Sequence, residues 1–132
     1  MIASELRIGN LIQANGPVME VKAINEYGVE LYLHGSESDN WEEEIENCQG
    51  IELSPEILDK CGFEIGGYDM LFWSKGNFEL AGLNWADAGI EEYQFVNFRW
   101  NDGKDGILQI HYLHQLQNLY FTLTGEELQI NL

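Results

Sequence analysis

Basic residues are scarce in this chain of 132 residues. Six Lys and Arg stand against 23 Asp and Glu, which gives a formal net charge of −17 at pH 7. Binding to duplex nucleic acid or to an anionic membrane needs clustered cations that neutralise phosphates. The basic residues are instead scattered singly: Arg7, Lys22, Lys60, Lys75, Arg99 and Lys104. The sequence therefore predicts no direct binding to duplex nucleic acid and no membrane attachment.

Cysteines, targeting signals and long apolar runs are also sparse. Cys48 and Cys61 fit no zinc or Cys-x-x-Cys spacing, so reduced thiols are expected. The amino terminus lacks the basic and apolar regions of a secretory signal. No apolar run approaches the roughly 18 residues that span a bilayer. These features predict a cytoplasmic protein.

Catalytic signatures are missing as well. The chain contains no Gly-x-Ser-x-Gly, His-Glu-x-x-His, Walker A or dinucleotide-binding pattern. His111 and His114 are neighbours on a helix, and His34 could complete a metal site, but no supporting residues identify one. Carboxylate pairs are expected by chance among 23 acidic residues. We therefore predict no catalytic residue, no metal site, no cofactor and no enzymatic activity.

What the chain does have is enough apolar material to fold. Apolar residues make up 45% of it, and it contains four Trp, six Tyr and six Phe. This composition argues against intrinsic disorder. The length fits one domain, residues 1–132, with possible subdomains at 1–52, small and barrel-like, and 53–132, mixed α and β.

Short strands joined by tight turns are predicted over residues 6–34. Asn15-Gly16 favours a hairpin turn because both residues readily take positive φ. A second turn is expected at residues 25–28, followed by a strand over 29–33 in which apolar and polar residues alternate. The pattern is typical of a curled antiparallel sheet or a small SH3-like barrel.

Acidic residues dominate the next segment. Nine of them and no basic residue lie between Gly35 and Asp59, and residues 39–46 are the densest part. The spacing does not match a calcium-binding EF-hand loop. We expect a solvated loop with Trp41 and Ile45 turned inward.

Two helices are predicted, at about residues 54–61 and 111–123. For the first, Ser54 is a suitable N-cap, Pro55 suits the first helical position, and Gly62 suits a left-handed stop. The second has one broad apolar face, formed by Tyr112, Leu113, Leu116, Leu119, Tyr120 and Leu123.

A second face of the 111–123 helix carries His114, Gln117 and Phe121. A simple surface helix would have Lys and Glu there. We predict that this face packs against a second layer, either the amino-terminal strands or the 54–61 helix.

Further antiparallel strands are expected between the helices, at 70–74, 78–83, 92–100 and 107–110, and a short one at 128–130. Runs of strands interrupted by two helices indicate the α+β class.

Three stretches resemble a known group of proteins. These are Leu113 to Leu128 (Leu-His-Gln-Leu-Gln-Asn-Leu-Tyr-Phe-x-Leu-Thr-Gly-Glu-Glu-Leu), Leu6 to Asn10 (Leu-Arg-Ile-Gly-Asn) and Leu53 to Glu64. They are similar to signatures of small uncharacterised proteins found in Bacteroidetes and their phages. The resemblance implies a phage or prophage setting and assigns no role to any residue.

The aromatic content exceeds what a small core needs, which favours an interface. The candidate partner-binding or ligand-binding residues are Trp41, Trp73, Trp85, Trp100, Tyr93, His114 and Phe121. The leading hypothesis is a non-enzymatic interaction protein of phage or prophage origin. It would act through an aromatic and acidic surface on a protein partner, or by self-association as a homo-oligomer such as a dimer. Mimicry of DNA is a special case.

Two other functions stay open. A protein that binds or sequesters a nucleotide signal could stack bases on Trp or Tyr, although cations for the phosphates are few. A metal-dependent hydrolase could use His111, His114 and nearby carboxylates.

Overall fold

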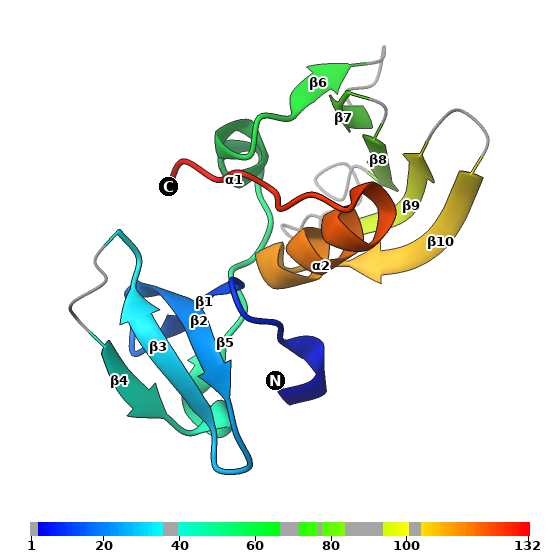
Figure 1. Cartoon of the computed structure of the whole chain (residues 1–132). Helices are drawn as coiled ribbons and strands as arrows, with labels where there is room; N and C mark the ends of the chain where they lie inside the picture. The colour runs from blue at the N-terminus through cyan, green and yellow to red at the C-terminus, as the bar shows by residue number, and fades with distance from the viewer. Residues whose placement is uncertain (1–2, 36–39, 67–71, 77, 84–93, 101–103) are drawn as a thin grey trace. The chain divides into compact units, whose positions relative to one another are not determined.

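The computed structural model describes residues 3–35, 40–66, 72–76, 78–83, 94–100 and 104–132. Over these residues the chain forms two five-stranded antiparallel sheets and two α-helices (Figure 1). The predicted α+β class, with a curled amino-terminal sheet and two helices, is confirmed. The chain divides into two compact units, residues 1–51 with 112–118 and residues 52–111 with 119–132.

Seven short elements make up most of the first unit. They are η1 (Ala3–Glu5), β1 (Leu11–Ala14), β2 (Val18–Ile24), β3 (Val29–Leu33), β4 (Asn40–Glu43), η2 (Ile45–Asn47) and β5 (Cys48–Gln49). The strand order is β4-β3-β2-β1-β5, so the last strand returns to pair with the first. This order, with a 3-10 turn between β4 and β5, gives the curled half-barrel that the strand pattern predicted.

The hairpin between β1 and β2 forms where the sequence predicted it. Asn15 and Gly16 have φ values of 57° and 111°, in the left-handed region that Asn and Gly tolerate. The register pairs Leu11 with Glu20 and Gln13 with Val18.

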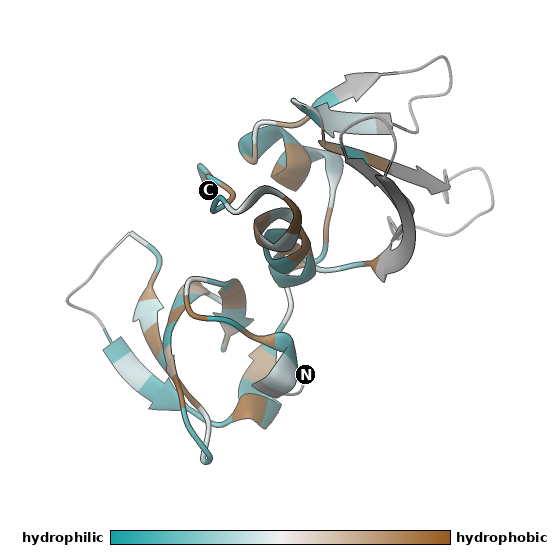
Figure 2. Ribbon diagram, turned by 45° about the vertical axis from the view of Figure 1, so that its right-hand side comes forward, coloured by the Kyte–Doolittle hydropathy of each residue, from teal (hydrophilic) through white to brown (hydrophobic). Residues whose placement is uncertain are grey.

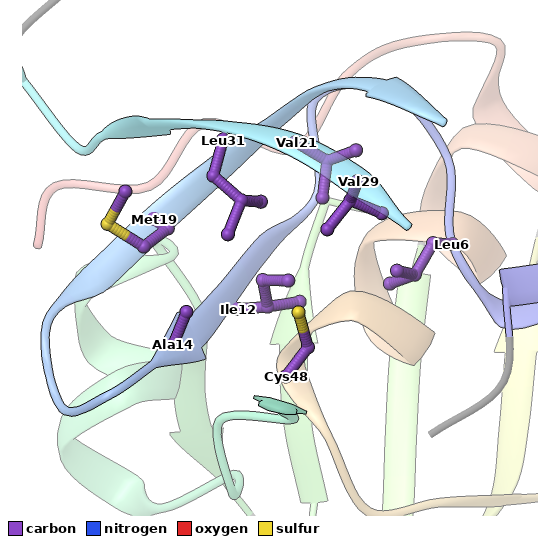
Figure 3. Packing of buried hydrophobic residues seen from close by; sticks show 8 residues of the cluster. All are labelled: Leu6, Ile12, Ala14, Met19, Val21, Val29, Leu31 and Cys48. Atoms are coloured by element: carbon purple, nitrogen blue, oxygen red, sulfur yellow. The ribbon is translucent and has the colours of Figure 1, made fainter. Parts of the chain in front are cut away.

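The core of the first unit is formed by the inward-facing residues of this sheet. Residues on alternate positions of β2 and β3 are buried, as the period of two in a strand requires. Figure 3 shows these side chains converging from several strands. The cluster consists of Leu6, Ile12, Ala14, Met19, Val21, Val29, Leu31 and Cys48.

The second unit combines the other sheet with helix α1 and the end of helix α2. Its strands are β6 (Glu64–Gly66), β7 (Phe72–Lys75), β8 (Phe78–Leu83), β9 (Gln94–Trp100) and β10 (Lys104–Ile110), in the order β10-β9-β8-β7-β6. The helices are α1 (Pro55–Lys60) and α2 (Leu113–Thr124), the latter with its first six residues in the first unit.

Aromatic contacts stabilise the core of the second unit. Phe78 meets Phe63 and Tyr120 edge to face, with ring centroids 5.9 and 5.5 Å apart. Such pairs add about 0.5–1.5 kcal/mol to the gain from burial. Lys75 Nζ lies 5.8 Å from the centre of the Tyr120 ring and donates to the carbonyl oxygen of Cys61.

Three expectations about local structure are wrong. The densest acidic residues form strand β4 rather than a loop, because their backbone pairs with β3 from Val29↔Glu43 to Tyr32↔Asn40. Trp41 is 36% exposed rather than tucked inward, whereas Ile45 does pack on the core. Residues 128–130 form no strand; there Leu128 is buried, and the neighbouring Asn131 N–H donates to Lys60.

Helix α2 begins two residues later than predicted. His111 and Leu113 use their backbone groups outside the helix: the His111 carbonyl accepts from Leu53 N–H, and Leu113 N–H donates to the Ile51 carbonyl. His111 is thus tied to residue 53 before the helix begins, and the Leu113 N–H, which has no acceptor within the helix, finds one at Ile51. The helix ends where predicted, since Gly125 takes a φ of 74°.

Among the described residues, no helix has both the length and the apolar character required to cross a membrane.

We predict that Ser54→Ala destabilises the protein. The Ser54 hydroxyl accepts a hydrogen bond of 3.2 Å from Ile57 N–H at the start of α1, and its removal leaves that donor unpaired. The free energy of unfolding should fall by about 1 kcal/mol, measured by urea denaturation. Ser54→Asp retains a capping oxygen and should stay close to the wild type. Equal stability of the alanine variant would contradict the capping role.

Candidate functional site

Strand β4 and the turn before β3 form the most distinctive surface of the first unit. Its members are Tyr27, Glu30, Trp41, Glu42, Glu43 and Glu44, which we call the acidic edge because β4 is the outer strand of its sheet. In Figure 2, β4 is teal to white, in contrast to the brown residues in the rest of its sheet.

The turn at residues 25–28 projects Tyr27 into solvent. Asn25 Oδ1 accepts hydrogen bonds of 2.9 Å from both Tyr27 N–H and Gly28 N–H, which fixes the turn. The Tyr27 side chain is 83% exposed, more than any other large apolar or aromatic side chain described. A single exposed apolar residue needs no explanation, but this one lies beside a pocket.

Gly28 brings the turn against the end of β4. A Cβ atom at position 28 would collide with the carbonyl oxygen of Glu43, and this neighbour is backbone that cannot swing aside. Only glycine therefore allows the two segments to approach this closely.

A pocket of about 360 Å³ lies at this junction. It is lined by Asn25, Tyr27, Gly28, Val29, Glu42, Glu43 and Glu44. Three of these residues are glutamates, and none of those described is basic. Glu43 is held in place by Asn47 Nδ2 at 2.9 Å and Asn15 Nδ2 at 3.3 Å. The pocket is thus suited to a cationic group.

Two glutamates face each other on the outer side of the sheet. The register places Glu30 directly opposite Glu42, and like charges in such a cross-strand pair are destabilising. Asn40 Nδ2 donates a hydrogen bond to Glu30 Oε1 at 3.3 Å. Lys22, on the same side of the sheet, is ion-paired with Glu20.

The predicted site residues of the first unit lie in two separate features. Trp41 belongs to the acidic edge. His114 is fully buried near the start of α2 and belongs to a polar network, where its side chain has no surface to offer a partner.

The predicted residues of the second unit are spread over several elements. Trp73 lies on β7 with only 7% of its surface exposed, and Trp100 ends β9. Phe121 lies on α2 and is 38% exposed. Trp85 and Tyr93 fall outside the described residues.

The buried network joins the first half of α2 to the amino-terminal segment. Gln117 Oε1 accepts from Leu11 N–H at 2.8 Å, and its Nε2 donates to the Gly9 carbonyl at 3.2 Å. Asn118 Oδ1 accepts from Asn10 Nδ2 at 2.8 Å. The His114 and Gln117 face was predicted to pack against either the amino-terminal strands or the 54–61 helix, and Gln117 bonds to the amino-terminal segment. Phe121 on the same predicted face is partly exposed.

The surroundings of His114 in this network favour its neutral form. Its Nε2 lies 3.3 Å from the Glu5 carboxylate, its ring stacks on Tyr112 with centroids 5.7 Å apart, and its Nδ1 has no hydrogen-bond partner among the described residues. Burial lowers the pKa of His114, and both the hydrogen bond that the Glu5 carboxylate accepts and its negative charge oppose that shift in part.

Both cysteines are buried free thiols. Burial raises the pKa of Cys48, with a further contribution from Glu43, and raises that of Cys61 to about 12. A thiol that stays protonated at neutral pH is a poor nucleophile.

The histidines do not gather carboxylates or each other into a metal site in the part of the chain that is described. His111 Nε2 lies 3.8 Å from Glu52, and His114 pairs with Glu5.

Sequence reasoning missed Tyr27, Gly28 and the Glu30–Glu42 pair. The predicted turn at 25–28 was the signal that could have placed Tyr27 at an exposed tip. The Asn10–Asn118 contact joins residues more than 100 positions apart, and no local pattern reveals such a pair.

Comparisons with protein-family models, with curated proteins and with solved structures find no match to this chain.

We predict that Gln117→Met destabilises the protein strongly. Methionine has neither the Oε1 that accepts from the Leu11 N–H nor the Nε2 that donates to the Gly9 carbonyl. The substitution therefore leaves these two backbone groups without their side-chain partner. The expected loss is about 1–3 kcal/mol in the free energy of unfolding, measured by denaturant titration. Gln129→Met, at an exposed position, is the matched control. A loss no larger than that of the control would rule out a stabilising network.

The lowered pKa of His114 makes stability depend on pH. Between the folded-state pKa and the unfolded value of 6.5, the unfolded chain binds a proton that the folded chain does not. Stability from this residue is therefore present above pH 6.5 and is lost as the pH falls below it. In His114→Gln the slope of stability against pH over this window should become shallower, as followed by thermal denaturation. His34→Gln is the control, and an unchanged slope in His114→Gln would contradict the assignment.

Proposed function

We propose that this protein is a non-enzymatic interaction protein that binds a basic protein partner through the acidic edge. The observation that carries the proposal is the pocket lined by three glutamates, with the 83% exposed Tyr27 at its rim. Carboxylates attract Lys and Arg, and an aromatic face adds a cation–π contact. Exposed aromatic residues are also enriched in protein interfaces.

The repulsion between Glu30 and Glu42 supports a basic partner. A like-charged cross-strand pair lowers the stability of the free protein. A cation bound between the two carboxylates would attract both of them, so the pair would stabilise the complex although it destabilises the free protein. This is the behaviour expected of a binding surface. With a formal charge of −17, the whole chain would also attract a basic partner over long range and speed association.

Self-association fits the acidic edge less well. Two copies meeting through this surface would bring their glutamates together, and like charges across an interface cost several kcal/mol. A nucleotide ligand fits less well for the same reason, since its phosphates would meet carboxylates and no described cation in the pocket.

A phage or prophage setting follows from the resemblance of the three sequence stretches, and we retain it as part of the proposal. The two buried free thiols are compatible with a reducing compartment, and we propose the cytoplasm.

We predict opposite effects of Glu42→Gln on stability and on binding. Removing one charge of the Glu30–Glu42 pair should raise the free energy of unfolding by roughly 0.2–1 kcal/mol, measured by urea denaturation. The same substitution should weaken capture of basic proteins from a bacterial lysate by the immobilised chain, quantified by mass spectrometry. Captured proteins should be released at 1 M salt, where the Debye length is about 3 Å.

Two further variants complete the test. Tyr27→Ser should also reduce capture, because it removes the aromatic rim of the pocket. Glu64→Gln removes an exposed charge from the second unit and should leave capture unchanged. If all three variants retained the wild-type set of proteins, the acidic edge would not be the binding surface.

A further inference from the structure

The acidic edge contains backbone groups that the sheet does not use. Strand β4 is the last in the order β4-β3-β2-β1-β5, and no other described strand pairs with its outer side. An edge strand of this kind presents a row of N–H and C=O groups that can pair with another chain.

The register shows which groups these are. His34 N–H donates to the Val18 carbonyl, so His34 points its backbone groups toward β2. In an antiparallel sheet this direction alternates along the strand. Tyr32 and Glu30 therefore also point toward β2, whereas Leu31 and Val29 point toward β4.

The pairing of β4 then assigns its own groups. Trp41 lies opposite Leu31 and Glu43 opposite Val29, so these two residues use their backbone groups inside the sheet. The intervening Asn40 and Glu42 direct their N–H and C=O groups out of the sheet edge.

We propose that the partner binds as an extended Lys- or Arg-containing segment that adds a sixth strand to β4. This inference rests on the proposed function and specifies its mode of binding. Strand addition derives affinity from backbone hydrogen bonds and specificity from pockets for alternate side chains. The N–H and C=O of Glu42 pair with the incoming backbone, and a basic side chain of the segment enters the pocket between Tyr27 and the three glutamates.

Charge identifies the occupant of the edge. Charged residues on an edge strand also prevent edge-to-edge pairing between copies of the same chain. Three successive glutamates at residues 42–44 repel the same glutamates of a second copy and attract a basic strand. A neutral strand gains no electrostatic attraction from them. The edge is therefore open only to a partner of opposite charge.

Synthetic peptides provide the probe. We would measure, by isothermal titration calorimetry, binding of an eight-residue peptide that alternates Lys and Val, which favours an extended strand. The comparison peptide alternates Lys and Gly and has the same charge. A third peptide carries N-methyl groups on every second residue, which blocks the backbone donors along one edge. The first peptide should bind at least tenfold more tightly than the other two.

Two variants of one residue separate charge from backbone pairing. Glu42→Gln removes the charge and retains the N–H, whereas Glu42→Pro removes both. Proline should be tolerated by the fold because this N–H points away from the sheet. The proline variant should bind the Lys/Val peptide roughly tenfold more weakly than the glutamine variant, the equivalent of one hydrogen bond. Circular dichroism and thermal denaturation verify that both variants are folded.

The outcomes distinguish the two proposals. If the peptides of equal charge bound equally well and both Glu42 variants behaved alike, strand addition would be overturned while an acidic binding surface would stand. If none of the basic peptides bound the wild type, the basic partner would be overturned as well. A wild-type dimer in sedimentation velocity that became monomeric in Glu42→Pro would show that a second copy occupies the edge, and would overturn the inference. If Glu42→Pro failed to fold, the N-methylated peptide would decide the question alone.

Discussion

The close approach between Gly28 and the carbonyl oxygen of Glu43 is the constraint on which the binding surface depends. Because position 28 has no side chain, the turn before β3 can lie directly against the end of β4. This contact places Tyr27 at the rim of the pocket and the glutamates of β4 along its wall. A larger residue would push the turn away and separate the aromatic ring from the carboxylates, so one glycine couples the two chemical features of the site.

The buried network stabilises the free protein, whereas the like charges of the acidic edge destabilise it. Gln117, Asn118 and Asn10 satisfy one another and nearby backbone groups, as buried polar groups must. Glu30 and Glu42 instead place two like charges opposite each other on the outer side of the sheet, an arrangement that is destabilising in general. Interactions that lower the stability of a free protein are expected where a partner compensates for them, whereas buried hydrogen bonds between distant segments hold the fold together. We therefore assign binding to the edge and a structural role to the network.

Local signals predicted the local structure well. The Asn15-Gly16 hairpin, the Ser54 cap of α1 and the Gly125 stop of α2 each depend on residues within a few positions of one another, and all three appear as expected. Strand β4 was missed because its charge suggested a loop. An edge strand tolerates charge on its open side, and its pairing with β3 is a nonlocal property that acidic composition does not reveal. The start of α2 was misplaced for the same reason, since backbone bonds to residues 51 and 53 override its helical pattern.

The candidate site was harder to predict than the fold. The high aromatic content predicted a partner-binding surface, but composition cannot tell an exposed ring from a buried one. Trp73 and Trp41 were therefore both named as candidates, although Trp73 is buried and Trp41 is exposed. Tyr27 gained its importance from Gly28 and Glu43, which are 15 residues apart in sequence. The most direct measurement of the central claim is amide hydrogen exchange, read by NMR with and without the Lys/Val peptide. If a basic strand adds to β4, the amide of Glu42 becomes protected while that of Trp41, already used in the sheet, changes little; protection confined to residues outside β4 and the 25–28 turn would rule out strand addition.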